Sequence, residues 1–199
     1  MLKAIIFDID GVLADSREAV VQNTITLLAE FGQAVPPEKV RGMSTAHSAD
    51  SVLIALVPSL SQDRELLARM LRRLSKITQK NIHMVKPTPL AKAVPSLARK
   101  YYLAAASNRK TSAIPVLEML GIADRFVAIV TSADAPPKPD PGMINLALAK
   151  LHVPPSEAVF IGDNAEDEMA GKAAGVRTII LDGTKEEEVR KLLGELGGS

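Results

Sequence analysis

The sequence predicts an α/β fold in which helices cover both faces of a doubly wound parallel sheet. Five short apolar runs carry this prediction, and each is followed by polar or glycine-containing sequence, as buried parallel strands are when they end at a loop. Helical patterns separate the last four runs, and such alternation is typical of a parallel sheet. The predicted strands cover residues 2–7, 102–106, 126–131, 158–161 and 177–181.

Four helices are predicted between and after the last four strands. Gly121 and Gly175 directly follow two of them, at the position where a glycine commonly ends a helix. Asp140 and Pro141 suit the start of a third, as an N-cap residue followed by proline in the first turn. The predicted helices cover residues 112–120, 140–151, 164–174 and 185–196.

Residues 16–86 interrupt this alternation. No strand pattern occurs there, and three amphipathic stretches at 20–31, 51–57 and 64–77 predict helices instead. An all-helical segment inserted after the first strand of an α/β domain indicates a cap. We therefore expect a catalytic core made of residues 1–15 and 87–199, and a small helical cap made of residues 16–86.

Composition excludes several classes of function. The chain has 199 residues, of which 47% are hydrophobic, and this is enough to bury a core. It has no cysteine, which excludes disulfides, thiolate metal sites and a cysteine nucleophile. A net charge of +1, 3% aromatic residues and no tryptophan argue against a nucleic-acid partner.

The sequence also bears on where the protein is found. No apolar run reaches the roughly 18 residues that a membrane span needs. Carboxylates at Asp8 and Asp10 come too early for a signal peptide. We therefore expect a cytoplasmic protein with no membrane partner, present as a monomer or a weak homodimer.

Polar side chains follow four of the predicted strands, and the fold brings these strand ends together. In open parallel sheets, sites form beyond the carboxyl ends of the strands. The side chains expected at this edge are Asp8, Asp10, Ser107, Asn108, Lys138, Asp163 and Asp167.

These residue types suit phosphoryl transfer, which needs a nucleophile, neutralisation of charge and an acid for the leaving group. The Asp8 carboxylate can attack phosphorus and form an aspartyl phosphate. A divalent cation must then bridge two anions, and oxygen ligands such as Asp163 favour Mg²⁺. Lys138 and the Ser107 hydroxyl can bind phosphoryl oxygens. Asp10 can protonate the leaving alcohol and then take a proton from water.

Four motifs in order resemble those of the haloacid-dehalogenase-like superfamily, in particular its phosphoglycolate-phosphatase-like and β-phosphoglucomutase-like members with an inserted helical cap. The first is Asp8-Ile9-Asp10-Gly11-Val12-Leu13-Ala14-Asp15-Ser16, and the second is Ser107-Asn108. The third is Lys138-Pro139-Asp140-Pro141, and the fourth runs from Gly162-Asp163 through Asp167 to Gly175. Gly171 stands where alanine is commoner in the family.

The resemblance implies a role for each matched residue. Asp8 is expected to be the nucleophile and a metal ligand, and Asp10 the acid/base, with its backbone carbonyl on the metal. Asp163 and Asp167 are expected to hold Mg²⁺, although Asp167 can instead pack behind the site. Phosphate is expected to contact Ser107, Asn108 and Lys138, although Ser107 can instead only cap the next helix.

Recognition of the leaving group is expected from the cap. In similar proteins a loop between two cap helices reads the substrate, and here the candidates are Arg41 and His47. A solvated loop is the alternative, with specificity then at Arg17, Lys86 or Arg109. Residues 16–86 hold ten Lys/Arg against six Asp/Glu, which suits an anionic substrate, although such charges also form ordinary solvated helix faces.

The sequence thus predicts a Mg²⁺-dependent phosphatase that hydrolyses a small phosphorylated metabolite through an aspartyl phosphate. A sugar phosphomutase would use the same residues but would retain the phosphoenzyme. A hydrolase of a phosphono or acid-anhydride bond is a third reading. A non-catalytic binding module on the same fold is the alternative outside enzymes, because a fold alone does not prove activity.

Overall fold

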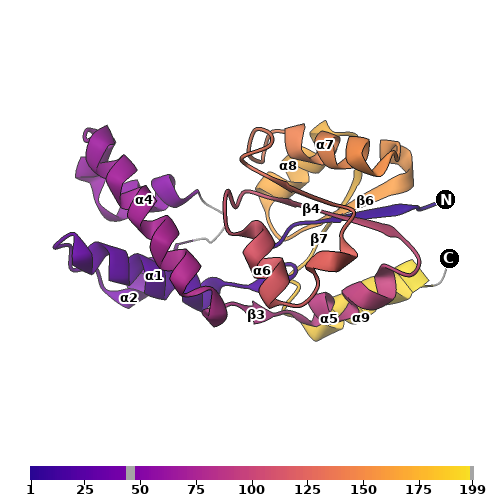
Figure 1. Ribbon diagram of the computed structural model, residues 1–199, viewed down its shortest axis with the longest axis horizontal. Helices are drawn as coiled ribbons and strands as arrows, with labels where there is room; N and C mark the ends of the chain where they lie inside the picture. The colour runs from indigo at the N-terminus through magenta and orange to yellow at the C-terminus, as the bar shows by residue number, and fades with distance from the viewer. Residues whose placement is uncertain (44–47, 198–199) are drawn as a thin grey trace. The chain divides into compact units, whose positions relative to one another are not determined.

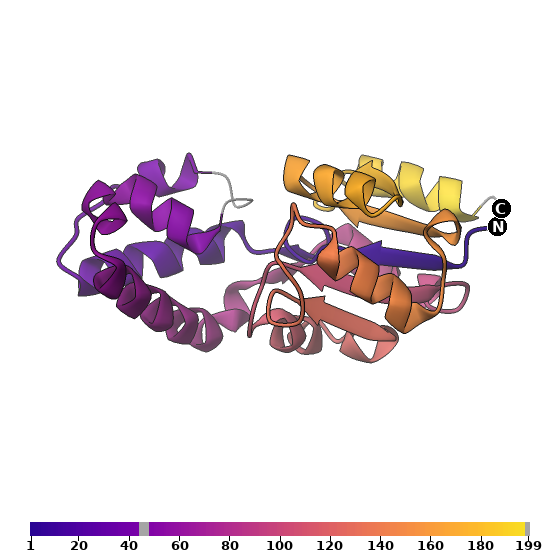
Figure 2. The same ribbon diagram turned by 90° about the horizontal axis from the view of Figure 1, so that it is seen from above.

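The computed structural model describes residues 1–43 and 48–197. The chain divides into two compact units (Figures 1 and 2). We call Met1–Asp15 together with Lys86–Ser199 the core unit, and Ser16–Val85 the helical unit. Each unit is described by itself below.

The core unit is built on a five-stranded parallel sheet in the order β5-β4-β1-β6-β7. Its strands are the five predicted ones, and the predicted α/β fold class is confirmed. The bounds are β1 Ala4–Phe7, β4 Tyr102–Ser107, β5 Ala128–Thr131, β6 Ala158–Gly162 and β7 Arg177–Ile180.

Strand β1 lies at the centre of the sheet and fixes the place of the site. Phe7 is in register with Ala105 of β4 on one side and with Ile161 of β6 on the other. From β1 the chain builds the sheet outward to β5 and then returns to build the other half through β6 and β7. The loops after β1, β4 and β6 therefore meet where the strand order reverses, which is where open α/β sheets place their sites.

Helices cover both faces of this sheet. Helices α7 and α8 lie on one side, and α5, α6 and α9 lie on the other (Figure 1). Under α7 and α8 the core includes Ile6 of β1, Val130 of β5 and Phe160 of β6. Successive side chains of a strand point to opposite faces, and these three point to the same face of the sheet. The bounds are α5 Pro89–Leu97, α6 Ala113–Met119, α7 Gly142–Leu151, α8 Ala165–Ala173 and α9 Glu186–Gly197, with 3₁₀ turns at Ala123–Arg125 and Pro155–Glu157.

Helix α5 was not predicted, although the other four helices of this unit were. The Thr88 hydroxyl accepts a hydrogen bond from the Ala91 N–H at 3.2 Å, and Pro89 occupies the first turn. Both features begin a helix, but the sequence with Pro87 and Pro89 indicates a hinge at residues 84–89 instead. The sequence signal for the start of α5 was an N-cap threonine followed by a proline.

The chain leaves and re-enters the core unit at one place. A two-residue strand, β2 Ala14–Asp15, pairs antiparallel with β3 Lys86–Pro87. Thr88 strengthens this junction because its hydroxyl donates to the Val12 carbonyl at 2.6 Å and its N–H donates to the Leu13 carbonyl at 3.1 Å. The two ends of the inserted segment are therefore fixed side by side.

The helical unit has an apolar core of its own, formed by residues such as Leu28, Leu53, Leu60 and Met70. Asp63 caps the longest helix by accepting from the Leu66 N–H at 2.9 Å. Three helices were predicted here, and the short α2 was not. The bounds are α1 Arg17–Glu30, α2 Pro37–Arg41, α3 Ala49–Leu56 and α4 Arg64–Lys80, with 3₁₀ turns at Pro58–Ser61 and Ile82–Met84.

Within residues 1–43 and 48–197, none of the helices combines the length and the apolar character needed to cross a bilayer.

Candidate active site

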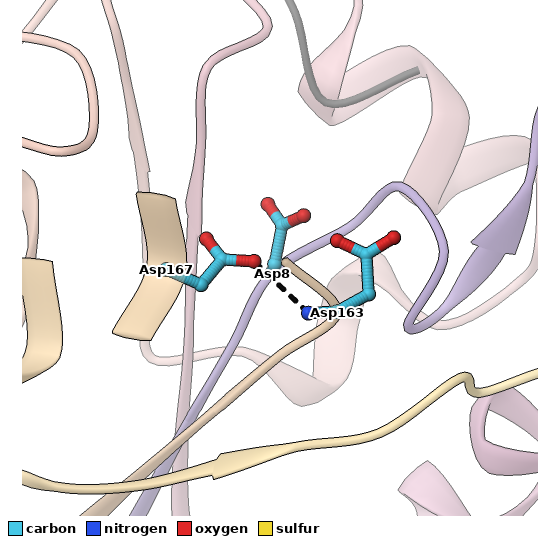
Figure 3. Close-up of side chains that lie close together, drawn as sticks. All are labelled: Asp8, Asp163 and Asp167. Atoms are coloured by element: carbon cyan, nitrogen blue, oxygen red, sulfur yellow. Dashed lines mark hydrogen bonds between the residues drawn. The ribbon is translucent and has the colours of Figure 1, made fainter. Parts of the chain in front are cut away.

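Three carboxylates gather at the carboxyl edge of the sheet. One oxygen each of Asp8, Asp163 and Asp167 lies within 4.8 Å of the others (Figure 3). Asp8 directly follows β1, Asp163 follows β6, and Asp167 lies in the first turn of α8. Asp8 and Asp167 are buried, whereas Asp163 is partly exposed. Asp163 and Asp167 lie 155 or more positions after Asp8 in the sequence. The parallel topology of the sheet brings them together.

Two glycines make this approach possible. A Cβ atom on Gly11 would lie 1.9 Å from Asp163 Oδ2, and Gly11 has a φ of +73°, which favours glycine. A Cβ atom on Gly162 would lie 2.3 Å from the Cβ of Asp167. Both positions therefore need the absence of a side chain, since any larger residue would displace a carboxylate of the cluster.

Gly171, where alanine is commoner in similar proteins, has a packing reason here. A Cβ atom at this position would lie 1.9 Å from the Thr178 hydroxyl oxygen, between α8 and β7. Thr178 on the neighbouring strand occupies the space that an alanine methyl would need. The glycine at position 171 therefore affects the packing of α8 against β7, and it does not contact the carboxylates.

Lys138 lies between two of these carboxylates. Its Nζ atom is 2.7 Å from Asp8 Oδ1 and 2.5 Å from Asp167 Oδ1, and only 3% of its side chain is exposed. A buried ammonium is tolerated when charged partners surround it in this way. The lysine thus fixes the orientation of Asp8 and offsets part of the negative charge.

Burial and charge change the acidity of this cluster. Burial raises the pKa of Asp8 well above its usual range, and Asp167 and Asp10 add to the shift while Lys138 opposes it. Burial likewise raises the pKa of Asp163 to about 6. Burial alone would lower the pKa of Lys138, but the charges of Asp8 and Asp167 outweigh it and raise that pKa.

Asp167 supports its neighbours through both oxygens. Its Oδ1 pairs with Lys138, and its Oδ2 accepts the backbone N–H of Asp163 at 3.0 Å (Figure 3). Asn164 adds to this network because its side chain donates to Asp163 Oδ1 at 2.7 Å and caps α8 by accepting from the Asp167 N–H at 3.1 Å. The first turn of α8 therefore holds Asp163 in place.

Ser107 is the last residue of β4, and Asn108 directly follows it. The Ser107 hydroxyl oxygen accepts the backbone N–H of Arg109 at 3.3 Å, which leaves the hydroxyl hydrogen to donate. The Asn108 side chain accepts the Lys138 N–H at 2.8 Å and donates to the Lys138 carbonyl at 3.2 Å. Asn108 thus holds Lys138, a contact that the sequence did not predict, and its direct contact with phosphate stays a prediction.

Asp10 is bound by an arginine that sequence reasoning had considered only as a substrate contact. Arg109 Nε donates to Asp10 Oδ2 at 2.7 Å, and Arg109 Nη2 donates to Asp10 Oδ1 at 2.6 Å. Burial opposes the charge of Arg109, but the Asp10 carboxylate raises the pKa of the guanidinium. The adjacency of Arg109 to Ser107-Asn108 was the available signal.

The two candidates for specificity belong to the helical unit. Arg41 ends α2, and its Nη2 donates to both carboxylate oxygens of Glu18 at 2.8 and 3.0 Å. Both residues line a pocket of about 450 Å³ together with Arg17, Val21 and Val40, among others. His47 lies outside the described residues.

The donor set at the edge of the sheet fits a hard divalent cation. Four carboxyl groups, those of Asp8, Asp10, Asp163 and Asp167, face two cations, Lys138 and Arg109. The carboxyl groups outnumber the cations, and all of the candidate ligands are oxygen atoms, which Mg²⁺ prefers. The carboxylates of Asp8, Asp163 and Asp167 could therefore hold a divalent cation.

The order of these residues along the chain matches a known family. Residues 5–181 match the haloacid dehalogenase-like hydrolases. The chain belongs to this family. The resemblance inferred from the four motifs is confirmed, and the match covers the whole set of candidate residues from Asp8 to Asp167.

Several curated relatives of this hydrolase are phosphatases. An N-acetylmuramic acid 6-phosphate phosphatase of Pseudomonas putida is 27% identical over 89% of this chain and 81% of its own length. A phosphoglycolate phosphatase of Yersinia pseudotuberculosis is 28% identical over 90% of this chain and 81% of its own length. A pyrophosphatase of Bacillus velezensis is 49% identical, but over only 31% of this chain and 29% of its own length.

Solved structures have the same fold. A haloacid-dehalogenase-superfamily hydrolase of Geobacter sulfurreducens superposes with a TM-score of 0.75 and is 25% identical. The match covers 97% of each chain. The family and its relatives together support an enzyme of the phosphatase class.

Proposed function

We propose that this hydrolase is a Mg²⁺-dependent phosphatase that cleaves a small phosphomonoester through a phosphoaspartate on Asp8. The observation that carries the proposal is the contact of Lys138 with Asp8 at 2.7 Å, beside two further carboxylates at the switch point of the sheet. A buried carboxylate that is oriented by a cation and faces further metal-type ligands has the composition that phosphoryl transfer requires.

Mg²⁺ would be held by Asp8 and Asp163, with the backbone carbonyl of Asp10 as a further ligand. When bound, it supplies the positive charge that lets a carboxylate approach a phosphate dianion. Asp167 is better placed behind this site than on the metal, because both of its oxygens already have partners. Its contribution is to hold Asp163 and Lys138.

In the first step an Asp8 oxygen attacks phosphorus, and the bond from phosphorus to the leaving oxygen breaks. Asp10 gives a proton to that oxygen, so that an alcohol departs. Lys138 and the Ser107 hydroxyl bind the phosphoryl oxygens in this step. In the second step Asp10 takes a proton from water, which attacks phosphorus and releases inorganic phosphate and the Asp8 carboxylate.

The helical unit is proposed as the cap that selects the leaving group. Two of the relatives are phosphatases of phosphoglycolate and of N-acetylmuramic acid 6-phosphate, and both of these compounds carry a carboxylate besides their phosphate. Arg41, Arg17 and Glu18 line the pocket in this unit, and a second anionic group of the substrate would replace Glu18 as the partner of Arg41. Arg41 and His47 remain the proposed specificity residues, and the protein is proposed to act in the cytoplasm.

The proposal is tested by phosphate release from a panel of sugar, acid and nucleoside phosphates, measured with Mg²⁺ and after EDTA. We expect turnover that EDTA removes and Mg²⁺ restores, and an Asp8→Asn variant that folds but does not turn over. Isomerisation without phosphate release would favour a phosphomutase. A folded protein that releases no phosphate from any ester or anhydride would favour the binding module.

A further inference from the structure

The Asp10 carboxyl group is held on one edge by the Arg109 guanidinium. The fork of two hydrogen bonds, at 2.6 and 2.7 Å, fixes the plane of the carboxyl group as well as its position. The neighbouring strands β1 and β4 bring the two residues together, since Asp10 follows β1 and Arg109 follows β4.

Arg109 is itself anchored at both ends. Its Nη1 donates to the Ser112 hydroxyl at 3.0 Å, and its backbone N–H donates to the Ser107 hydroxyl at 3.3 Å. Only 11% of its side chain is exposed, compared with 28% for Asp10. Because these contacts restrict the movement of the guanidinium, its position determines the position of the Asp10 carboxyl group.

We propose that Arg109 is a positioning residue for Asp10, which holds that carboxyl group in the place where it exchanges a proton with the leaving oxygen and with the attacking water. The inference rests on the proposed function and deepens it. The fork binds both oxygens of the carboxyl group and so fixes its position and its plane. Arg109 thereby acts on proton transfer without touching phosphorus.

This role predicts which steps suffer when Arg109 is lost. An alkyl phosphate needs a proton on its leaving oxygen, whereas a dinitrophenolate departs without one. The value of kcat/KM reports the steps up to departure of the leaving group, and kcat also includes attack by water. If the Asp10 carboxyl group is no longer held in position, both kcat/KM and kcat should fall for an alkyl phosphate. For a dinitrophenyl phosphate only kcat should fall.

The experiment compares Arg109→Gln and Arg109→Lys with the wild type, using glycerol 2-phosphate and 2,4-dinitrophenyl phosphate with saturating Mg²⁺. Lysine keeps the charge but lacks the planar fork. Arg177→Gln is the matched control, because Arg177 forms an exposed pair with Glu195 at 3.7 Å on the same unit. Thermal melting of each variant establishes that it is folded at the assay temperature.

For Arg109→Gln we expect kcat/KM to fall about a hundredfold on glycerol 2-phosphate and by less than about threefold on dinitrophenyl phosphate, with a burst of dinitrophenolate. Arg109→Lys should show the same pattern, and Arg177→Gln should match the wild type. An equal loss on both substrates, or no loss on either, would overturn the inference while the proposed function stands.

Two further results also decide the matter. If both Arg109 variants melt below the assay temperature, the residue serves folding and the inference is wrong. If the wild type turns over neither ester nor any phosphate of the panel, the proposed function fails and this inference fails with it.

Discussion

Asn108 holds Lys138 by its backbone, with one end of the side-chain amide on the Lys138 N–H and the other on its carbonyl. The lysine side chain then reaches Asp8 and Asp167 from a fixed starting point. Two loops, one after β4 and one after β5, are joined at this contact, and the Ser132 hydroxyl adds a bond to the Asn108 carbonyl at 3.0 Å. The position of the positive charge beside Asp8, the proposed nucleophile, therefore depends on the Asn108 amide, which contacts only the backbone of Lys138.

Replacing Asn108 by alanine should displace Lys138. Loss of two hydrogen bonds at about 1 kcal/mol each should lower the melting temperature by several degrees, and kcat/KM should fall about tenfold or more. Calorimetry and phosphate-release kinetics measure the two effects. Ser132→Ala is the control, because it removes a bond to the same residue and leaves the contact with Lys138. Full activity in Asn108→Ala would show that the lysine needs no such support.

Asp163 and Asp167 should differ when each is changed to asparagine. Asp163→Asn should raise the Mg²⁺ concentration for half-maximal activity by about tenfold or more, because a proposed ligand is lost. Asp167→Asn should shift that concentration less, but it should cost about 3 kcal/mol of stability in EDTA, because a buried ion pair with Lys138 is broken. Mg²⁺ titration and urea unfolding separate the two, and the reverse ranking would place Asp167 on the metal.

The affinity for Mg²⁺ should rise with pH. The pKa of Asp163 is raised to about 6, so the carboxyl group binds a proton more tightly in the folded protein than in the unfolded chain. This group therefore favours the folded metal-free protein at low pH, and its contribution disappears as the pH rises to about 6. Above that pH the ionised group is available to the cation, and binding releases fewer protons.

We therefore expect the increase in melting temperature on adding Mg²⁺ to grow from about pH 5 to about pH 7.5. Differential scanning calorimetry at matched ionic strength measures this increase. Asp163→Asn should weaken the dependence, because the amide does not titrate, and the part that remains should come from Asp8, whose pKa is also raised. An increase that is the same at every pH would mean that these carboxyl groups do not bind the ion.

Arg41 should matter for the natural leaving group and little for a generic aryl phosphate. Replacing it by alanine should lower kcat/KM by about tenfold, or about 1.4 kcal/mol, for a substrate with a second anionic group. Glu18→Gln is the matched variant, because it breaks the same ion pair and keeps the cation. Equal losses on both kinds of substrate would instead indicate a role in the stability of the helical unit.

The predictable parts of the fold are those that depend on residues close together in the sequence. The run Ile5-Ile6-Phe7 before Asp8 is one example, and Asn164 before α8 is another, since its side chain caps that helix. The convergence of Asp8 with Asp163 followed from these local signals, because parallel strands deliver their carboxyl ends to one edge.

The contacts that were not predicted join residues far apart in sequence through their exact orientation. Whether Asn108 turns toward phosphate or toward Lys138, 30 positions away, depends on the course of the loop after β5. The fork between Arg109 and Asp10 spans 99 positions and depends on side-chain rotamers at two strand ends. Neither residue type nor periodicity carries that information.

The pairing of Ala14–Asp15 with Lys86–Pro87 has an evolutionary consequence. Because the inserted segment departs and returns through two adjacent strands, its length and sequence can drift while the spacing of its anchor points stays constant. The proposed catalytic machinery of the core unit and the proposed substrate-selecting surface of the helical unit can then be inherited as separate modules. If the helical unit selects the substrate as proposed, changes confined to residues 16–85 would be enough to change the substrate.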